Sequence, residues 1–279
     1  MSVSAIVVTY NTGPRLKECL YAIVAANVVN ELVIVDNGNP PEMQVWLKSF
    51  AEAGNKVMLI TPDANIGFGR AVNLASGAAR YDALVVINPD CVVRHDAIQA
   101  LGQAVAGRSS PVLVGGRIFD VSGSNQRGPM RRELTLRRAI SKIVGRSGTD
   151  MPLVPQPIEA FPVDVVSGAF FLMRREDFNA LGGFDERYFL HVEDIDLCKR
   201  VREAGGEVIY QPKAGALHYG STSDAPSVVV ERHKAAGFAR YFRKFSKGSL
   251  HRFAAELLIP IIRTGLILRA LFAGRSKPH

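Results

Sequence analysis

The sequence contains few cysteines, and their placement excludes two common kinds of cross-linked scaffold. The three cysteines, Cys19, Cys91 and Cys198, are odd in number and lie far apart among 279 residues. Their spacing matches neither a disulfide framework nor a zinc site. We therefore expect a protein of a reducing compartment, the cytoplasm.

The sequence also lacks a long apolar segment near its start. The apolar run at residues 5–8 is too short for a signal peptide, has no basic residues before it and continues into a polar turn at residues 11–14. This run predicts a buried first strand instead. No internal repeat is visible, and an apolar share of 47% can fill the core of one large α/β domain, with or without a tail.

Acidic residues are outnumbered, since 26 Asp and Glu stand against 34 Lys and Arg, giving a net charge of +8. This excess indicates an anionic partner, but charge alone does not choose among nucleic acid, a phosphorylated substrate and an acidic membrane surface. The arginines at about 122–157 are not interleaved with aromatic residues, as platforms for single-stranded nucleic acid require. We therefore expect no nucleic-acid partner.

Short β-branched runs alternate with stretches of helical pattern through the first hundred residues. The runs are 3–9, 32–35, 57–60 and 84–87, and the helical stretches begin near Pro14, Pro41, Gly67 and His95. Such alternation predicts parallel strands joined by helices. With a further strand at 112–120, residues 1–120 are expected to form a nucleotide-binding half.

The second half of the sequence is less regular. The basic segment at about 122–157 has little periodicity and is predicted to be a mobile insertion. Ordered patterns then follow: a strand pair or long bent strand at 163–173, a helix at 192–204 ended by Gly205-Gly206, and a strand at 208–210. Residues 160–225 are expected to form an acceptor-binding half that completes a domain of residues 1–225.

Residues 226–279 have a helical pattern, with an apolar stretch at 253–272. Arg263, Arg269 and Pro260 interrupt this stretch and argue against a membrane-spanning helix. Two alternatives stay open. The stretch forms an interfacial helix on anionic lipid, aided by Arg243, Lys244 and Lys247, or it packs on the catalytic domain or on a second subunit, as in a homodimer.

Polar residues follow the predicted strands at Thr9-Tyr10-Asn11, Asp36-Asn37-Gly38, 63–65 and Asn88-Pro89-Asp90. Because ligands bind outside the carboxyl ends of strands in open α/β sheets, these segments predict a nucleotide site. Asp90 is placed to hold Mg²⁺ or Mn²⁺ against a diphosphate, since hard cations take oxygen ligands. A turn built from Asn, Pro and Asp is the structural alternative.

The loop at residues 65–69 is rich in glycine and opens a helix, so its N–H groups are candidates to approach phosphates. It is not the dinucleotide fingerprint, because Val72 stands where the third glycine belongs. Asp36 is a candidate to bind a base or ribose, and an Asx-turn at residues 36–38 explains it equally well.

Glu193, Asp194 and Asp196 fall near the start of a predicted helix. Asp196 and Arg200 are expected to form an exposed ion pair, and Asp194, on the less polar face, is the candidate general base. Acids that satisfy free N–H groups at a helix start are the alternative. His218 is a candidate ligand for metal or phosphate, although a lone histidine is more often structural.

These residues together resemble the family 2 inverting glycosyltransferases of the GT-A fold, and among them the bacterial rhamnosyltransferase-like members. The resemblance covers about the first 220 residues. It runs through Val7-Val8-Thr9-Tyr10-Asn11, Val35-Asp36-Asn37-Gly38, Asn65-Ile66-Gly67-Phe68-Gly69, Ile87-Asn88-Pro89-Asp90, Ser167-Gly168-Ala169-Phe170, Gly182-Gly183-Phe184-Asp185-Glu186, Glu193-Asp194-Ile195-Asp196-Leu197 and His218.

The resemblance implies an α/β fold of GT-A type, with a Rossmann-like, mostly parallel sheet flanked by helices and a C-terminal helical extension. It implies that Asp194 is the catalytic base, and that Asp90 and His218 hold Mg²⁺ or Mn²⁺. Asn88 replaces the first acid of the family's Asp-x-Asp motif, so metal affinity without nucleotide should be low. Candidate nucleotide-binding residues are Thr9, Tyr10, Asn11, Asp36, Asn65, Gly67 and Asn88, and candidate sugar-pocket residues are Gly168, Ala169 and Glu193.

The implied activity is transfer of a sugar from a nucleoside diphosphate, with deoxythymidine-diphosphate (dTDP) rhamnose as the expected donor. The expected acceptor is a hydroxyl of a glycan or polyprenyl-linked glycan in cell-envelope polysaccharide synthesis, at the inner face of the plasma membrane. Alternatives are a UDP-sugar donor, a nucleotidyltransferase and a non-catalytic sugar-nucleotide binder. A nucleotidyltransferase is disfavoured because residues 10–15 do not form its glycine- and arginine-rich loop.

Overall fold

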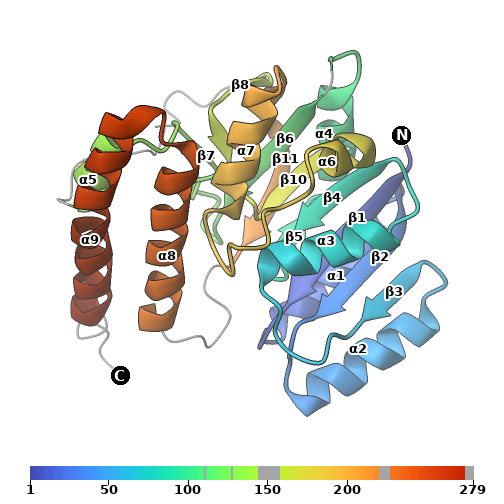
Figure 1. The fold of residues 1–279 in the computed structure, drawn as a ribbon. Coiled ribbons are helices and arrows are strands. Elements are labelled where there is room, and N and C mark those ends of the chain that lie inside the picture. Colours follow the sequence, from blue (N-terminus) through green and yellow to red (C-terminus); the bar gives the residue numbers. More distant parts are fainter. Residues whose placement is uncertain (110, 127, 144–157, 220–226, 274–279) are drawn as a thin grey trace.

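The computed structural model describes residues 1–109, 111–126, 128–143, 158–219 and 227–273. A nine-stranded mixed sheet forms its centre, in the order β3-β2-β1-β4-β10-β6-β11-β5, with β8 paired to β11 (Figure 1). The strands are β1 (Val3–Thr9), β2 (Val29–Asp36), β3 (Val57–Ile60), β4 (Ala83–Ile87), β5 (Cys91–Val93), β6 (Val112–Phe119), β7 (Met130–Arg131), β8 (Phe161–Pro162), β9 (Val165–Val166), β10 (Phe170–Arg174) and β11 (Glu207–His218).

Nine helices accompany these strands within the described ranges. They are α1 (Arg15–Ala25), α2 (Pro41–Ala53), α3 (Phe68–Ala78), α4 (Ala97–Val105), α5 (Leu136–Ile143), α6 (Arg175–Ala180), α7 (Glu193–Glu203), α8 (Ser227–Phe245) and α9 (Gly248–Ala273). Helix α7 ends as predicted, because the N–H of Gly206 donates to Val201 O and Gly205 has a φ of 80°.

The first half confirms the predicted parallel sheet. β3, β2, β1 and β4 are parallel to one another, and every residue of β1 and of β4 is buried. Strands covered on both faces have continuous apolar sequences, which explains the β-branched runs. Parallel pairing brings the carboxyl ends of β1, β2 and β4 to one edge of the sheet.

The second half reverses direction at β10, which is antiparallel to both β4 and β6. Strand β11 is parallel to β6 and antiparallel to β5, and it extends to His218. The prediction that this strand ends at Tyr210 was therefore wrong. A register shift lies between Gln211 and Gly215, and beyond it the strand pairs with β6 on one edge and with β5 on the other.

Two apolar clusters fill the two faces of the sheet. One cluster packs α1, α2 and α4 against residues such as Val7, Ile34 and Val85. The other packs α3, α6 and α7 against Ile6, Val33 and other side chains of the opposite face. Helices α8 and α9 contribute Tyr241, Phe242, Ile259 and Ile262 to this second cluster, so the helical tail is built into the core.

The segment at about 122–157 is predicted to be a mobile insertion, and its described part packs against the rest of the protein. Strand β7 pairs with β9, and Met130, Leu134 and Leu136 are buried in the second cluster. Helix α5 contacts α9. This packing could not be predicted from the sequence, because the segment contacts distant helices and has no local periodicity. Residues 144–157 lie outside the described residues.

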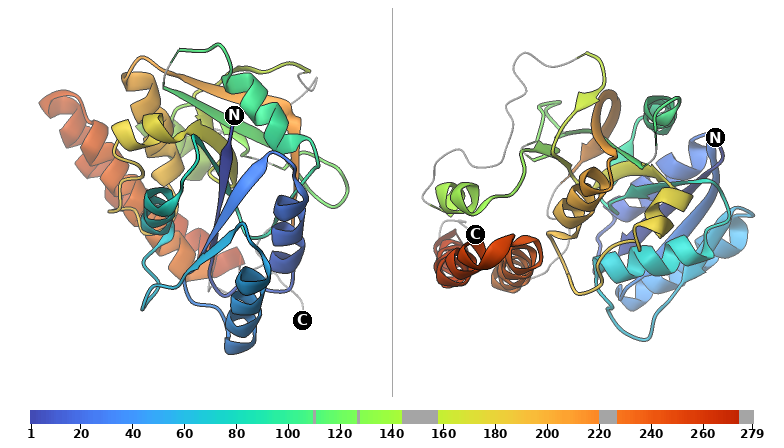
Figure 2. Two further views of the ribbon diagram at one scale, coloured as in Figure 1. Left: turned by 90° about the vertical axis from the view of Figure 1, so that its right-hand side faces the viewer. Right: turned by 45° about the horizontal axis from the view of Figure 1, so that its top comes forward.

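The helical tail forms an antiparallel hairpin of α8 and α9 at the end of the molecule far from α2 and β3 (Figures 1 and 2). No helix in the described part of the chain has both the length and the apolar composition needed to cross a membrane. The packing of α9 on α5 and α8 agrees with the alternative that placed this helix on the catalytic domain.

Candidate active site

The ends of β1 and β2 form a buried polar turn. Thr9 lies directly opposite Asp36 in the parallel register, and both residues are buried. Asp36 Oδ1 accepts hydrogen bonds from the N–H groups of Gly38 and Asn39, at 3.1 and 3.0 Å, which confirms the Asx-turn. Asn39 Nδ2 donates to both Asp36 Oδ1 and Thr9 Oγ1, so Asn39 fixes the two predicted residues relative to each other.

Asn37 connects this turn to the loop after β3. Its Nδ2 donates to Asn65 Oδ1 at 2.8 Å, and its Oδ1 accepts from the Ile66 N–H at 3.0 Å. Sequence analysis did not assign a site role to Asn37 or Asn39. The consecutive polar residues after β2 were the available signal, but their partners come from loops about thirty residues away.

Beside this buried turn, Tyr10 is 44% exposed and Asn11 has a φ of 45°. The N–H of Asn11 donates to Gly38 O, and an added Cβ at Gly38 would lie 3.4 Å from the Tyr10 ring. The exposed ring therefore borders the buried Thr9 and Asp36. This arrangement suits a nucleoside, with stacking on the ring and hydrogen bonds beneath it.

The loop at residues 65–69 is held by the protein itself. The N–H groups of Ile66, Gly67 and Phe68 donate to Asn37 Oδ1, Asn65 Oδ1 and Phe189 O. Gly67 has a φ of 85°, and a Cβ there would meet Phe189 O at 2.7 Å. Glycine is therefore required at this position for packing. The N–H groups that the sequence offered to phosphates already have partners.

Asp90 and His218 come together because β5 and β11 pair with Cys91 opposite His218. His218 Nε2 lies 3.2 Å from Asp90 Oδ1, which is the separation expected for two neighbouring ligand atoms on one small cation. Gln126 Oε1 lies 2.7 Å from His218 Nδ1, and Gln126 Nε2 donates to His218 O at 2.6 Å. If His218 donates its Nδ1–H to Gln126 Oε1, its Nε2 is unprotonated and can bind a metal.

Cys91 completes this group of possible ligands. Burial, followed by the charge of Asp90, raises the pKa of its thiol well above the ordinary value. A protonated thiol is a poor ligand, and Mg²⁺ and Mn²⁺ prefer oxygen or imidazole. The donor set of Asp90 and His218 therefore fits a hard divalent cation that takes its remaining ligands from phosphate and water.

Asn88, which follows β4, links the segment that carries Asp90 to the predicted sugar pocket. Its N–H donates to Ala169 O at 2.8 Å, and its own carbonyl accepts from the Cys91 N–H. The neighbouring Gly168 N–H donates to Asp194 Oδ2 at 3.0 Å. A Cβ at Gly168 would lie 3.2 Å from Asp194 Cβ, so glycine permits the close approach of α7. Gly168 and Ala169 thus connect the candidate base, Asp194, to the segment between β4 and β5 that carries Asp90.

Asp194 lies in the first turn of α7 and is partly open to solvent. Its Oδ2 is ion-paired with Arg131 Nη2, and its Oδ1 accepts from the Ile195 N–H at 2.8 Å. Burial by itself raises the pKa of Asp194, but the charge of Arg131 and the hydrogen bonds from Gly168, Arg131 and Ile195 lower it below its ordinary value. The carboxyl group is therefore ionised at neutral pH.

The pKa of Glu193 is shifted in the opposite direction to that of Asp194. Its side chain is buried, and Oε2 makes no hydrogen bond among the described residues. Desolvation and then the charge of Asp194 raise the pKa of Glu193 to about 8. Adjacent carboxyl groups are therefore held in different protonation states, as expected where like charges and burial act on one site.

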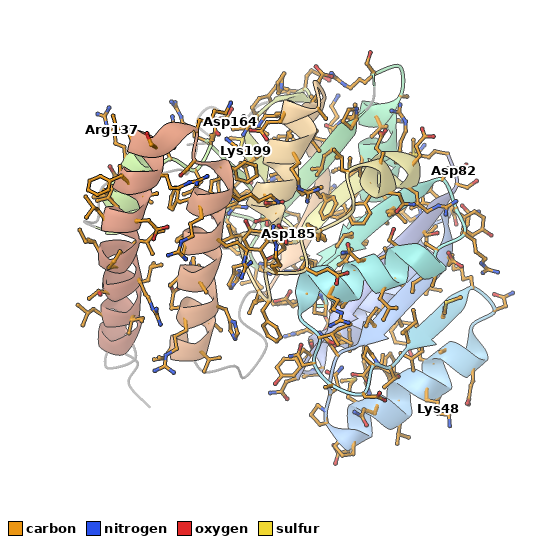
Figure 3. The ribbon with its side chains drawn as sticks, in the orientation of Figure 1. Lys48, Asp82, Arg137, Asp164, Asp185 and Lys199 are labelled. Atoms are coloured by element: carbon orange, nitrogen blue, oxygen red, sulfur yellow. The ribbon has the colours of Figure 1, made fainter. Side chains whose placement is uncertain are left out.

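The prediction of an exposed ion pair between Asp196 and Arg200 was half right. The pair exists, with Arg200 Nε 2.6 Å from Asp196 Oδ2, but the Asp196 side chain is fully buried. Lys244 of α8 lies 2.6 Å from Asp196 Oδ1 and 2.9 Å from Oδ2 of Asp185, which Figure 3 labels. Helical spacing revealed the pair but not the second helix that covers it.

These features form a candidate nucleotide site, a candidate metal site and an ionised carboxylate at the carboxyl edge of an α/β sheet. The chain belongs to glycosyl transferase family 2, whose match covers residues 4–182. Residues 156–223 also match the family described as the N-terminal domain of galactosyltransferase. The protein is thus a glycosyltransferase, and its sheet and helices have the GT-A fold.

Two relatives of known name support this assignment. The chain is 29% identical over 252 residues to N-acetylglucosaminyl-diphospho-decaprenol L-rhamnosyltransferase of Mycobacterium tuberculosis, covering 82% of this chain and 81% of the relative. It is 30% identical over 161 residues to rhamnosyltransferase WbbL of Escherichia coli, covering 55% of this chain and 61% of that protein.

Solved structures agree on the fold. The mannosyltransferase PcManGT from Pyrobaculum calidifontis, in complex with GDP-Man and Mn²⁺, superposes with a TM-score of 0.60 at 19% identity, over 99% of this chain and 76% of that chain. GalNAc-T7 with UDP, GalNAc and Mn²⁺ gives a TM-score of 0.63 at 15% identity, over 92% of this chain and 54% of that chain.

Proposed function

We propose that the protein is a metal-dependent inverting rhamnosyltransferase. It takes rhamnose from dTDP-rhamnose and transfers it to a sugar hydroxyl on a polyprenyl diphosphate carrier, in cell-envelope glycan synthesis. The observation that carries this proposal is the chain of contacts from Asn88 through Ala169 and Gly168 to Asp194, which connects an ionised carboxylate to the segment that carries Asp90, the partner of His218. The two named rhamnosyltransferase relatives support the choice of sugar.

The predicted site residues would have separate roles in the reaction. Thr9, Tyr10 and Asp36 would hold the nucleoside, with Asn11, Asn65 and Asn88 along the same edge, and Asp90 and His218 would hold the metal. A bound Mg²⁺ or Mn²⁺ supplies charge neutralisation for the leaving diphosphate. Asp194 accepts the proton of the acceptor O–H while the oxygen forms a bond to the anomeric carbon. The bond from that carbon to the phosphate oxygen breaks, its electron pair leaves with dTDP, and configuration inverts.

Glu193, Gly168 and Ala169 are proposed to border the transferred or accepting sugar. A protonated Glu193 would present an O–H donor beside the ionised Asp194, so the two carboxyl groups would make complementary contacts with sugar hydroxyls. We further propose that residues 1–225 form the catalytic domain and that the hairpin of α8 and α9 is its membrane-facing extension.

The surface of α9 supports this extension. Five large apolar residues are exposed at helical spacing, namely Leu250, Phe253, Leu257, Ile261 and Leu268, at 81%, 63%, 59%, 56% and 47% of their area. Lys247, Arg252 and Arg263 are also exposed. An apolar stripe flanked by cations suits a helix lying on anionic lipid. Lys244, which the sequence assigned to this attraction, instead binds Asp196 and Asp185.

Calorimetric titration with dTDP, UDP and GDP, each with and without Mg²⁺ or Mn²⁺, tests the donor part of the proposal. We expect metal-dependent binding of dTDP over the other two. A preference for UDP would keep the glycosyltransferase and discard rhamnose. Transfer of labelled rhamnose to a lipid diphosphate-linked N-acetylglucosamine, followed by determination of the anomeric configuration, then tests acceptor and stereochemistry.

A further inference from the structure

Arg131 is in direct contact with the candidate base, Asp194. It belongs to β7, which pairs with β9, and its Nη2 contacts both Asp194 Oδ2 and, at 3.4 Å, Val166 O. The side chains of Arg131 and Asp194 are 18% and 16% exposed. The pair is therefore not sealed inside the core but can be reached from the surface.

Further charged groups surround this pair from other elements. Desolvation, and then the positive charges of Lys234 on α8 and of Arg131, lower the pKa of His191, while Asp194 and Glu231 raise it. Lys234 of α8 and Arg131 of β7 therefore both act on His191, three residues before Asp194. Lys234 Nζ lies 3.3 Å from Glu231 Oε1. Each of the two cations is thus paired with a carboxylate, and an anionic ligand can compete with that carboxylate for it.

The contact between Arg131 and Asp194 opposes the chemistry expected of Asp194. A guanidinium on a carboxylate stabilises its ionised form and makes it a weaker proton acceptor. General-base catalysis becomes more effective as the pKa of the base rises toward the working pH. A ligand that draws Arg131 away from Asp194 would therefore strengthen the base at the moment the acceptor is bound.

We propose that Arg131 is the binding group for the diphosphate of a lipid-linked acceptor, and that this diphosphate draws Arg131 off Asp194 to release the base. The proposal rests on the glycosyltransferase function proposed above. Arginine suits the role because its planar guanidinium can hold phosphate oxygens with two parallel hydrogen bonds. An acceptor without a diphosphate would leave the ion pair closed, so the same contact would select anionic acceptors.

The first test measures binding, so it does not depend on transfer. Decyl diphosphate is titrated calorimetrically, in the presence of dTDP and Mg²⁺, into the wild type and into Arg131→Gln, Arg131→Lys and Asp194→Asn. We expect Arg131→Gln to weaken binding about tenfold or more, the loss of one charge-assisted phosphate contact. Arg131→Lys should recover part of the affinity. Asp194→Asn should bind decyl diphosphate more tightly than the wild type, because it removes the carboxylate that competes for Arg131.

Arg132→Gln is the matched control, since Arg132 is the exposed neighbour on the same strand end. It should bind decyl diphosphate like the wild type. Equal affinity of wild type and Arg131→Gln, or weaker binding by Asp194→Asn, would overturn the proposal. Thermal unfolding of each variant shows that the fold is kept, and Arg131→Lys retains the charge if Arg131→Gln does not fold.

The second test compares two acceptors, N-acetylglucosamine joined to an undecyl chain with and without the diphosphate. Arg131→Gln should raise the KM for the diphosphate acceptor about tenfold and leave that for the phosphate-free acceptor unchanged. If the ion pair had only a structural role, Arg131→Gln would change the KM for both acceptors equally. That result would contradict the proposed role of Arg131 while leaving the glycosyltransferase function intact. Absence of transfer to either acceptor would instead count against the proposed function, and the binding result would still decide the role of Arg131.

Discussion

The nucleotide half and the acceptor half of the site are held together by different kinds of interaction. At the ends of β1, β2 and β3, amides and hydroxyls such as Asn37, Asn39 and Thr9 bond to one another, to turn N–H groups and to the Asp36 carboxylate, without a cation. Around α7, the contacts are charged and come from β7 and α8, through Arg131 and Lys244. The difference suggests a fixed donor site and an acceptor site whose geometry depends on ion pairs that a charged ligand can rearrange.

The largest effect should come from Asp194→Asn, which keeps the shape of the acceptor half but removes its base. We expect transfer to fall by about 10³-fold, because a positioned general base contributes factors of this order. Binding of dTDP should stay at the wild-type level, since the donor half is unaltered. The measurement is kcat with the diphosphate acceptor, together with calorimetric titration of dTDP. Normal turnover would remove Asp194 from the mechanism.

Glu203→Gln is the control for this variant. Glu203 lies at the other end of α7, and its side chain is 45% exposed. It should keep wild-type turnover. A comparable loss in both variants would mean that charge changes anywhere on α7 disturb the fold.

The second-largest effect should come from a substitution in the donor half, at the candidate metal ligand Asp90. Asp90→Ala should weaken dTDP binding in the presence of Mn²⁺ by about 10²-fold, because one of two protein ligands is lost. Without metal the two proteins should bind dTDP equally. The exposed Asp96→Ala, six residues away, provides the control. Equal Mn²⁺ dependence in Asp90→Ala and the wild type would place the metal elsewhere.

Gln126 extends the donor half beyond the residues that the sequence revealed. Gln126→Ala removes the partner that fixes the His218 ring, and loss of such a partner typically costs about 10-fold or more in metal affinity. We expect weaker Mn²⁺ binding, measured in the presence of dTDP by electron paramagnetic resonance of the free ion. Exposed Gln103→Ala on α4 should leave it unchanged. An unaltered affinity in Gln126→Ala would show that His218 does not need this partner.

The buried Glu193 gives the acceptor half a pH dependence. Its pKa is raised to about 8 in the folded protein, so the folded state holds a proton that the unfolded chain releases above its ordinary value of 4.5. The stabilising contribution is present below that ordinary value and is lost as the pH rises through about 8. Between these limits, the free energy of unfolding should fall by at most about 1.4 kcal/mol per pH unit.

Urea unfolding of wild type and Glu193→Gln across pH 5 to about 8 isolates this contribution. The variant carries a neutral amide of the same shape, so the stability difference between the two proteins should shift in its favour as the pH rises. A difference that stays constant with pH would show that Glu193 is already ionised in the folded protein.

The sequence predicted the donor half better than the acceptor half for a physical reason. Buried parallel strands have recognisable apolar runs, and their ends identify Thr9, Asp36 and Asp90 without knowledge of the partner strands. By contrast, the contacts of the acceptor half and of the His218 ring join residues that are far apart in the sequence. Arg131, Gln126 and Lys244 each bond to a residue 63, 92 or 48 positions away, respectively, and no local periodicity indicates such contacts. For the same reason, the burial of Met130 and Leu134 could not be predicted from the sequence of the basic segment at about 122–157.

The smallest expected effect concerns the surface beyond the acceptor half. Replacing Phe253 and Leu257 by serine removes two exposed apolar residues of α9, and we expect binding to anionic vesicles to fall about tenfold, since partial burial of each residue contributes about a kcal/mol. Flotation with phosphatidylglycerol-containing vesicles measures it. Val45→Ser on α2, where the residue is 68% exposed, is the matched control and should float like the wild type. If the double variant also floats like the wild type, the stripe does not face lipid, and a second protein chain becomes the better candidate to cover it.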